Sequence, residues 1–267
     1  MEAIAGEYNV LHQKGVFVKV KPPIESKIHD GCLVFAEKEG VEGEMKRKVR
    51  ISAKGYTEVW GEDFWHTYSL TLGHNTLFSS LAYAASRDLE IHHLDAVPAY
   101  LNSDLHEEIY LRPPDGIPLK PGTIWLLKKA LYGQKQAGLE WFKTLWNHIK
   151  SIGYSQSGYN PCLYVKDSNH FIVVYVDNLL LFSTIMRIAN EKEELTGRYE
   201  MCNLGEARWF LAMEISWDRV EHMIMIDQCK YIQKILTCFG LHNSKLVSTP
   251  MAANLKLLAL ETSTVDQ

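Results

Sequence analysis

The stretch 171–182 constrains the fold more than any other part of the chain. It reads Phe-Ile-Val-Val-Tyr-Val-Asp-Asn-Leu-Leu-Leu-Phe, so two β-branched, aromatic and aliphatic runs flank the polar pair Asp177 and Asn178. This pattern predicts two antiparallel strands joined by a tight hairpin whose turn residues, Asp177 and Asn178, tolerate positive φ. One interpretation is a buried hairpin with a merely polar turn, because Asp and Asn are common in turns. The other is a carboxylate held at the hairpin tip for chemistry.

A second acidic residue, Asp95, follows another strand-like run at 89–94. Before that run, the segment 76–87 carries apolar residues at helical spacing and predicts a helix. Asp95 then has two interpretations. It caps a helix that begins within 96–101, or it stands at a strand end like Asp177. Two aspartates at strand ends suggest a metal site, because hard divalent cations prefer oxygen ligands.

Composition is that of an ordinary globular protein, with 46% hydrophobic and 22% charged residues in a chain of 267. No apolar run approaches the roughly 18 residues of a membrane-spanning helix, and the first residues do not read as a signal peptide. We therefore expect an intracellular protein, cytoplasmic or nuclear, without a membrane partner. The five cysteines are scattered and include no Cys-x-x-Cys pair, which predicts free thiols.

Net charge is −4, which argues mildly against a nucleic-acid partner, but two segments, 44–54 and 116–150, are locally basic. Within the first, polar and apolar residues alternate, which predicts a strand with a row of cations over an apolar underside. The polar face comprises Lys46, Lys48, Arg50, Ser52 and Lys54, and the apolar face comprises Val49, Ile51 and Ala53. A solvated strand face and a phosphate-binding surface both fit this pattern.

Residues 1–43 are weakly patterned, but periodicity predicts further elements elsewhere. Strands are expected at 16–20, 32–35, 208–215 and 223–226, and helices at 139–152, 185–199 and 231–239. The aromatic residues of the helix at 139–152 fall on its apolar face, which predicts core packing rather than base stacking.

Several short motifs occur in order along the chain. They are Leu94-Asp95, Ala99-Tyr100-Leu101-Asn102, Glu107-Glu108-Ile109-Tyr110, the run 127–133, Lys135-Gln136-Ala137 and Tyr175-Val176-Asp177. By these motifs, and by weaker matches at 30–31, 50–56, 204–207, 210–215 and 248–251, the chain closely resembles the reverse transcriptase domain of copia-type LTR retrotransposons. The resemblance covers residues 12–252 and leaves 253–267 as a tail.

This resemblance implies an α+β fold of polymerase fingers and palm, with an antiparallel palm sheet packed on helices. The fingers would lie mainly in 12–88 and the palm mainly in 89–227, with an inserted fingers-like segment around 110–135. A thumb-side or connection region would start in 228–252. The implied activity is RNA-directed DNA synthesis. Deoxynucleoside triphosphates are added to a primer on an RNA or DNA template with two Mg²⁺ ions, or with Mn²⁺.

The resemblance also assigns residue roles. Asp95 and Asp177 match the metal-binding aspartates of the family, and Asn178 occupies the next catalytic position. Tyr100 matches the aromatic residue that excludes a ribose 2′-hydroxyl. Arg50, Lys48 and Lys54 match cations that approach the triphosphate, and Gln136 falls in the template- and nucleotide-contacting motif. The primer-contacting segment would comprise Phe210, Leu211, Met213 and Glu214.

Departures from the family pattern bear on activity. Asn178 stands where the family has a second aspartate, so the site loses a negative charge while keeping a good turn residue. Pro98 offers no N–H in a segment whose backbone is expected near the triphosphate. Positions 70, 134 and 138–139 also differ from the family. Two hypotheses follow: a weakened polymerase from a drifted or fragmentary element copy, or a catalytically inactive nucleic-acid-binding or structural remnant.

Overall fold

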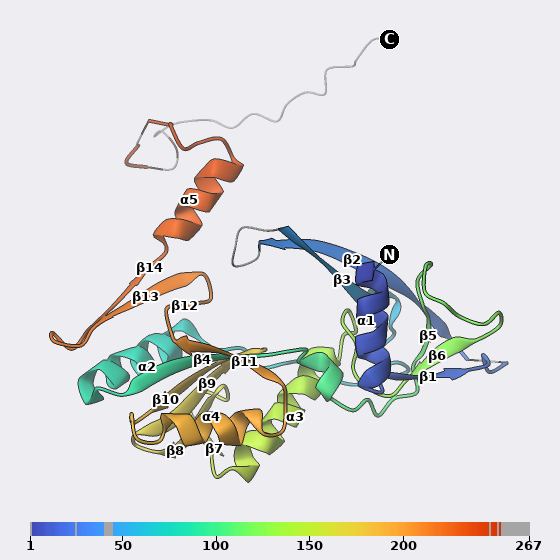
Figure 1. Cartoon of the computed structure of the whole chain (residues 1–267), viewed down its shortest axis with the longest axis horizontal. Helices are drawn as coiled ribbons and strands as arrows, with labels where there is room; N and C mark the ends of the chain where they lie inside the picture. Colours follow the sequence, from blue (N-terminus) through green and yellow to red (C-terminus); the bar gives the residue numbers. More distant parts are fainter. Residues whose placement is uncertain (1, 25, 40–44, 246, 250, 252–267) are drawn as a thin grey trace.

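The structure is a computed structural model that describes residues 2–24, 26–39, 45–245, 247–249 and 251. Within these residues the chain forms five α-helices and three β-sheets (Figure 1). The expected α+β composition with antiparallel sheets is therefore confirmed. The tail predicted at 253–267 lies outside the described residues, as does Pro250 of the motif at 248–251.

A six-stranded sheet forms the centre of the molecule, and every neighbouring pair in it is antiparallel. Its order is β11 (Met201–Glu206), β4 (Glu90–Ala96), β10 (Asn178–Ser183), β9 (His170–Tyr175), β8 (Leu163–Asp167) and β7 (Ser155–Gln156). The predicted hairpin supplies the two central strands, β9 and β10. Nearly all of their residues are buried, which explains why their sequence is continuously apolar rather than alternating.

Helices cover both faces of this sheet, as Figure 1 shows. Helix α2 (His74–Arg87) packs on one face against Val173, Leu180 and Phe182. Helices α3 (Ala137–Ser151) and α4 (Ile188–Thr196) pack on the other face, where the alternate strand residues point. The predicted helices at 76–87, 139–152 and 185–199 are thus confirmed, with shifted ends.

A second sheet of five strands lies beside the first. Its order is β1 (Phe17–Val20), β6 (Ile124–Leu127), β5 (Tyr110–Arg112), β2 (Ile28–Glu39) and β3 (Met45–Ala53). Helix α1 (Glu2–Gln13), which the weak pattern of 1–43 did not predict, packs against it through buried Leu11. In β3 the predicted apolar face is buried, but Ser52 is also buried at 8% exposure, and the Lys46 side chain lies outside the described part.

The third sheet is a small one made of β12 (Trp209–Phe210), β13 (Met213–Asp218) and β14 (Met223–Asp227). The single strand predicted at 208–215 is wrong, because Leu211 and Ala212 form a turn with φ of 50° and 62° and divide it into a hairpin. Helix α5 (Cys229–Cys238) follows and projects away from the body (Figure 1).

None of the helices in the described part of the chain is long and apolar enough to cross a membrane. The five cysteines are free thiols, as predicted.

Candidate functional site

The tip of the central hairpin differs by one residue from the sequence prediction. Tyr175 pairs with Asn178, so the two-residue turn is Val176–Asp177, and Asn178 is the first residue of β10. Val176, a β-branched residue, has a φ of 58°, a conformation that costs such residues about 1–2 kcal/mol. The turn therefore presents Asp177, while Asn178 is fixed in the sheet.

Helix α3 holds this strained turn in place. The indole Nε1 of Trp141, which is 1% exposed, donates a hydrogen bond of 2.8 Å to the backbone carbonyl of Val176. The predicted inward orientation of Trp141 is confirmed. The residue thus does more than fill the core, because it anchors the backbone immediately before Asp177.

We expect Trp141→Phe to lower the free energy of unfolding by about 1–3 kcal/mol, since it leaves the partly buried Val176 carbonyl without its donor. Trp146→Phe is the matched control, because Trp146 lies on the same helix and stacks on Tyr164 at 5.2 Å. Urea unfolding of the two variants measures the difference. Equal losses would show that the Val176 hydrogen bond contributes nothing.

Asp95 lies within strand β4 and pairs directly with Asn178 of β10. The interpretation of Asp95 as a helix N-cap is wrong, because a turn and the short 3₁₀ helix Tyr100–Asn102 follow it instead of an α-helix. The backbone N–H of Ala96 donates to the carbonyl of Asp177 at 2.8 Å. The two acidic residues are therefore brought to the same end of neighbouring strands, as the sequence predicts.

Both aspartates line one cavity of about 250 Å³. The other residues that line it are Lys48, Arg50, Ala96, Val97, Pro98, Ala99, Tyr100 and Tyr132. Strand β3 supplies the two cations, because its polar face turns toward the end of β4. Five of the residues assigned by the resemblance, Asp95, Asp177, Lys48, Arg50 and Tyr100, thus surround one space.

Two tyrosines order the cationic side of this cavity. The Arg50 guanidinium lies over the Tyr132 ring at 5.0 Å, and Tyr132 meets Tyr100 edge to face at 5.4 Å. Burial raises the pKa of Tyr100 above its usual value and that of Tyr132 to about 12, so both phenols stay neutral at physiological pH. Sequence spacing predicts no role for Tyr132 in the site, although the residue belongs to the motif at 127–133.

A glycine brings Tyr132 to this position. Gly133 has a φ of 86°, and a Cβ built on it would overlap the carbonyl oxygen of Ala53 at the end of β3. Ala53 in turn donates from its N–H to the Tyr132 carbonyl at 2.7 Å. Only glycine allows this close approach, which places the Tyr132 ring beneath Arg50.

Arg50 retains an unsatisfied donor beside the cavity. Its Nε is buried and has no hydrogen-bond partner among the described residues. Arg50 itself lines the cavity, so its guanidinium group is placed to meet an anionic ligand there. Arginine presents donors in a planar fork that suits phosphate oxygens.

The donor set also fits a divalent cation delivered with a phosphate. Among the described residues, no three His, Cys, Asp or Glu side chains are grouped to hold a metal ion by themselves. Mg²⁺, however, is commonly held by one or two carboxylates together with substrate phosphates and water. Asp95 and Asp177 supply that number of carboxylates, opposite Lys48 and Arg50.

Asn178 makes two side-chain hydrogen bonds. Its Nδ2 donates to Asp177 Oδ1 at 2.9 Å, and its Oδ1 lies 2.8 Å from His93 Nε2. Asn178 does not line the cavity. Where the family pattern has an aspartate, this chain thus has Asn178. The side-chain oxygen of Asn178 contacts His93.

The remaining predicted residues lie elsewhere. Lys54 follows β3 outside the cavity lining, and the Gln136 side chain is 1% exposed, with Nε2 donating to the Asp63 carbonyl at 3.2 Å. A contact between Gln136 and a nucleotide would require that side chain to move, so this role stays a prediction. Phe210 and Met213 are buried, whereas Glu214 pairs with Lys230 at 3.0 Å. Leu211 lies in the turn of the same hairpin.

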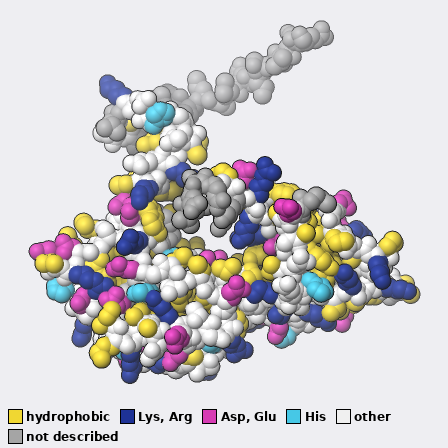
Figure 2. Space-filling view, viewed as in Figure 1, with side chains coloured by type: hydrophobic (Ala, Val, Ile, Leu, Met, Phe, Trp, Pro, Cys, Tyr) yellow, Lys and Arg dark blue, Asp and Glu magenta, His cyan; other side chains and the backbone are white. Residues whose placement is uncertain are grey.

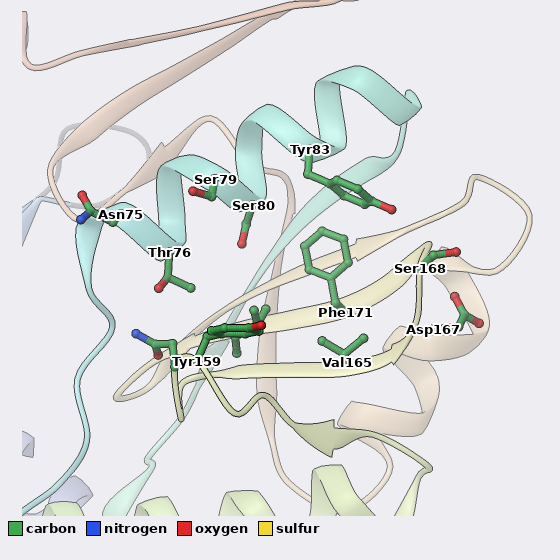
Figure 3. Close-up of a pocket in the computed structure, with 12 residues that line it drawn as sticks. Asn75, Thr76, Ser79, Ser80, Tyr83, Tyr159, Val165, Asp167, Ser168 and Phe171 are labelled. Carbon is green, nitrogen blue, oxygen red and sulfur yellow. The ribbon is translucent and has the colours of Figure 1, made fainter.

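A larger hollow of about 520 Å³ lies between α2 and the β8–β9 hairpin, as Figure 3 shows. Tyr83, Tyr159 and Phe171 give it aromatic walls, and Asp167 is the one charged residue that lines it among those described. With no cation for a phosphate and no second carboxylate for a metal, this hollow does not fit the chemistry that the smaller cavity supports.

In this fold, two carboxylates at the ends of neighbouring strands share a cavity with Lys48 and Arg50, which suit phosphate. This arrangement defines the class of protein. Comparison with known proteins identifies the family within that class. Residues 14–253 match the family described as reverse transcriptase (RNA-dependent DNA polymerase), and the chain belongs to this family.

Similar proteins are retrotransposon polyproteins. The chain is 34% identical over 265 residues to the retrovirus-related Pol polyprotein from transposon TNT 1-94 of Nicotiana tabacum, a match covering 96% of this chain and 20% of that protein. It is 31% identical over 263 residues to the Pol polyprotein from transposon RE1 of Arabidopsis thaliana, covering 96% and 18%. The Ty1-BR Gag-Pol polyprotein of Saccharomyces cerevisiae is 32% identical over 212 residues, covering 76% and 11%.

These matches confirm the resemblance drawn from the motifs. The chain is a reverse transcriptase domain of the copia type found in Pol polyproteins. It spans about a fifth or less of the length of the relatives named above.

Proposed function

We propose that this domain transfers deoxynucleotides from their triphosphates to the 3′ end of a primer on an RNA or DNA template, with activity weakened by Asn178. The observation that carries the proposal is the cavity in which Asp95 and Asp177 face Lys48 and Arg50. Asp95 and Asp177 would hold a divalent metal ion, and Lys48 and Arg50 would bind the triphosphate that accompanies it. The family's use of divalent ions supports Mg²⁺, or Mn²⁺, as the cofactor.

The placement of these residues supports a polymerase subdivision, which is part of the proposal. We assign the six-stranded sheet with α2, α3 and α4 to the palm, and the five-stranded sheet that contributes Arg50 to the fingers. The segment around 110–135, which provides β5 and β6, belongs with the fingers although it lies between palm elements in sequence. The region from 228, which includes α5, begins the thumb-side part.

Mechanistically, the residues have separate tasks. Asp95 and Asp177 would hold a divalent cation, which, when bound, activates the primer 3′-oxygen and neutralises the phosphates. Arg50, stacked on Tyr132, would orient the triphosphate with the part of its guanidinium group that lines the cavity. Tyr100 lines the cavity wall, and its ring would exclude a ribose 2′-hydroxyl. The hairpin around Leu211 would hold the primer end.

The template would lie along the space outside this cavity. In Figure 2, Lys and Arg side chains lie both on the arm that carries α5 and on the side of the five-stranded sheet that faces this arm. The net charge of −4 does not conflict with a nucleic-acid partner. Salt screens distant charges, so phosphate binding depends on the Lys and Arg side chains close to the nucleic acid.

Primer extension on an RNA template tests the proposal. We expect slow Mn²⁺-dependent extension by the unmodified chain and loss by a factor of at least about 100 in Asp177→Ala, which removes a metal-binding charge. Asp167→Ala is the matched control, because this aspartate lies on the same sheet but lines the other hollow. Extension that survives Asp177→Ala would contradict the assignment.

A second candidate function is a catalytically inactive nucleic-acid-binding domain. The observation that favours it is Asn178, whose amide is engaged by His93 and Asp177 and adds no negative charge. On this hypothesis, primed template binds in a salt-dependent manner while neither Mg²⁺ nor Mn²⁺ supports extension.

A further inference from the structure

We infer that His93 is a positioning residue that orients the Asp177 carboxylate through Asn178. This inference rests on the proposed function, because it concerns how the cation-binding carboxylate is held. Three side chains form the relay: His93 on β4, Asn178 on β10 and Asp177 in the turn.

Strand register places these side chains within reach of one another. Asn178 pairs with Asp95 and Leu180 pairs with His93, so His93 and Asn178 are diagonal neighbours across the β4–β10 pair. Side chains of paired residues project to the same face of a sheet, which puts His93, Asp95 and Asn178 on one side. The His93 Nε2 to Asn178 Oδ1 distance is 2.8 Å, and the Asn178 Nδ2 to Asp177 Oδ1 distance is 2.9 Å.

Chemistry fixes the direction of the relay. A carboxylate only accepts hydrogen bonds, so the Asn178 amide must turn its NH₂ group toward Asp177. Its carbonyl oxygen therefore faces His93, and an oxygen needs a donor there. His93 must carry a proton on Nε2, and the hydrogen bonds run from His93 to Asn178 to Asp177.

Packing keeps His93 in this position. Its side chain is buried, and its ring meets Phe210 edge to face at 5.5 Å with an interplanar angle of 76°. Phe210 is itself 2% exposed and belongs to the β12–β13 hairpin, the segment assigned to the primer end. The relay thus connects that hairpin to the carboxylate at the cavity.

The relay has a direct consequence for cation binding. By occupying one oxygen of Asp177 and both ends of the Asn178 amide, it restricts the carboxylate rotamer and leaves the other oxygen of Asp177 for the cavity that Asp95 also lines. Hydrogen-bond partners of metal ligands typically change metal affinity by about 10- to 100-fold when they are removed. His93 therefore supports the cation site without touching the ion.

The first test reads the relay itself. Nitrogen-15 NMR of the histidine rings in the unmodified chain should show His93 with its proton on Nε2, correlated with Phe210 ring protons, and this assignment should change in Asn178→Ala. His93 with a proton on Nδ1 alone would overturn the inference, whether or not the chain binds metal.

The second test measures Mn²⁺ affinity by the electron paramagnetic resonance signal of free Mn²⁺. We expect His93→Leu to weaken binding about tenfold and His93→Gln, whose amide restores a donor, to stay within about twofold of the unmodified chain. In the Asn178→Ala background, His93→Leu should cause no further loss, because the relay is already interrupted. His148→Leu is the matched control, since His148 is 5% exposed and bonds a backbone carbonyl on the other face of the sheet.

Outcomes separate this inference from the proposed function. Mn²⁺ binding that depends on Asp177 but is unchanged by His93→Leu, or additive losses in the double variant, would overturn the relay alone. Absence of Mn²⁺ binding by the unmodified chain would overturn both the proposed cation site and the role of His93 in it.

Discussion

Asn178→Asp is expected to raise Mg²⁺-dependent primer extension by about 10- to 100-fold over the unmodified chain. Asn and Asp are nearly isosteric, and position 178 is the first residue of β10, beside Asp95. The substitution therefore adds a third carboxylate at the strand end that borders the cavity. We expect this added charge to outweigh the loss of the hydrogen bond from Asn178 Nδ2 to Asp177 Oδ1, which an aspartate cannot donate. Removing a metal ligand or its hydrogen-bond partner typically lowers metal affinity or activity by about 10- to 100-fold or more. Restoring the carboxylate should therefore raise activity by a similar factor.

Stability should change little in this variant. We expect a difference within about 1 kcal/mol in the free energy of unfolding, since His93 can still donate to a carboxylate oxygen at position 178. The remaining cost is repulsion between clustered acidic groups in the absence of metal. Steady-state primer extension of both chains, with Asp177→Ala as the blank, gives the comparison. Robust extension by the unmodified chain that Asn178→Asp fails to improve would contradict the weakened-site account.

Tyr100→Ala in the Asn178→Asp background is expected to reduce discrimination against ribonucleotides by roughly 10- to 100-fold. Tyr100 lines the cavity between Pro98 and Tyr132, so removal of its ring opens space beside the sugar of a bound nucleotide. Incorporation of a ribonucleoside triphosphate should rise, while incorporation of the deoxy form falls less.

Tyr100→Phe is the control for this prediction, because it keeps the ring and removes only the hydroxyl. The ratio of kcat/KM for deoxy and ribo substrates measures discrimination in each variant. If Tyr100→Phe relaxed discrimination as much as Tyr100→Ala, the hydroxyl rather than the bulk of the ring would be responsible.

The central sheet could be predicted because its residues carry strong local signals. The run 171–182 is apolar on both faces, which identifies inner strands, and α2 and α3 show apolar stripes at helical spacing. The sequence predicts the turn one residue too late, because Asp-Asn is a common turn pair and Val176 is an unfavourable residue at positive φ. Trp141, distant in sequence, stabilises the turn that is observed.

Other features depend on contacts that sequence spacing does not contain. Helix α1 has a weak apolar pattern and forms because the five-stranded sheet offers it a surface for Leu11. The division of 208–215 into a hairpin rests on two residues at positive φ, neither of them glycine. His93 carries a signal only in hindsight: it precedes Asp95 by two residues and therefore shares its face of β4.

The candidate site could be predicted where motif residues lie on paired strands. Asp95, Asp177, Lys48, Arg50 and Tyr100 surround one cavity because β3, β4 and the β9–β10 turn meet there. Gln136 shows the limit of that reasoning. Its motif position indicates a nucleotide contact, yet its side chain is buried against the Asp63 backbone, which spacing in the sequence does not reveal.

The most direct test of the central claim is to locate bound Mn²⁺ by paramagnetic broadening of backbone amide NMR signals in the presence of a deoxynucleoside triphosphate. The account predicts that substoichiometric Mn²⁺ first broadens the amide signals of residues 95–97, 99–100, 132 and 176–178, and that Asp177→Ala abolishes this effect. Broadening confined to the hollow between α2 and the β8–β9 hairpin, or unchanged in Asp177→Ala, would contradict it.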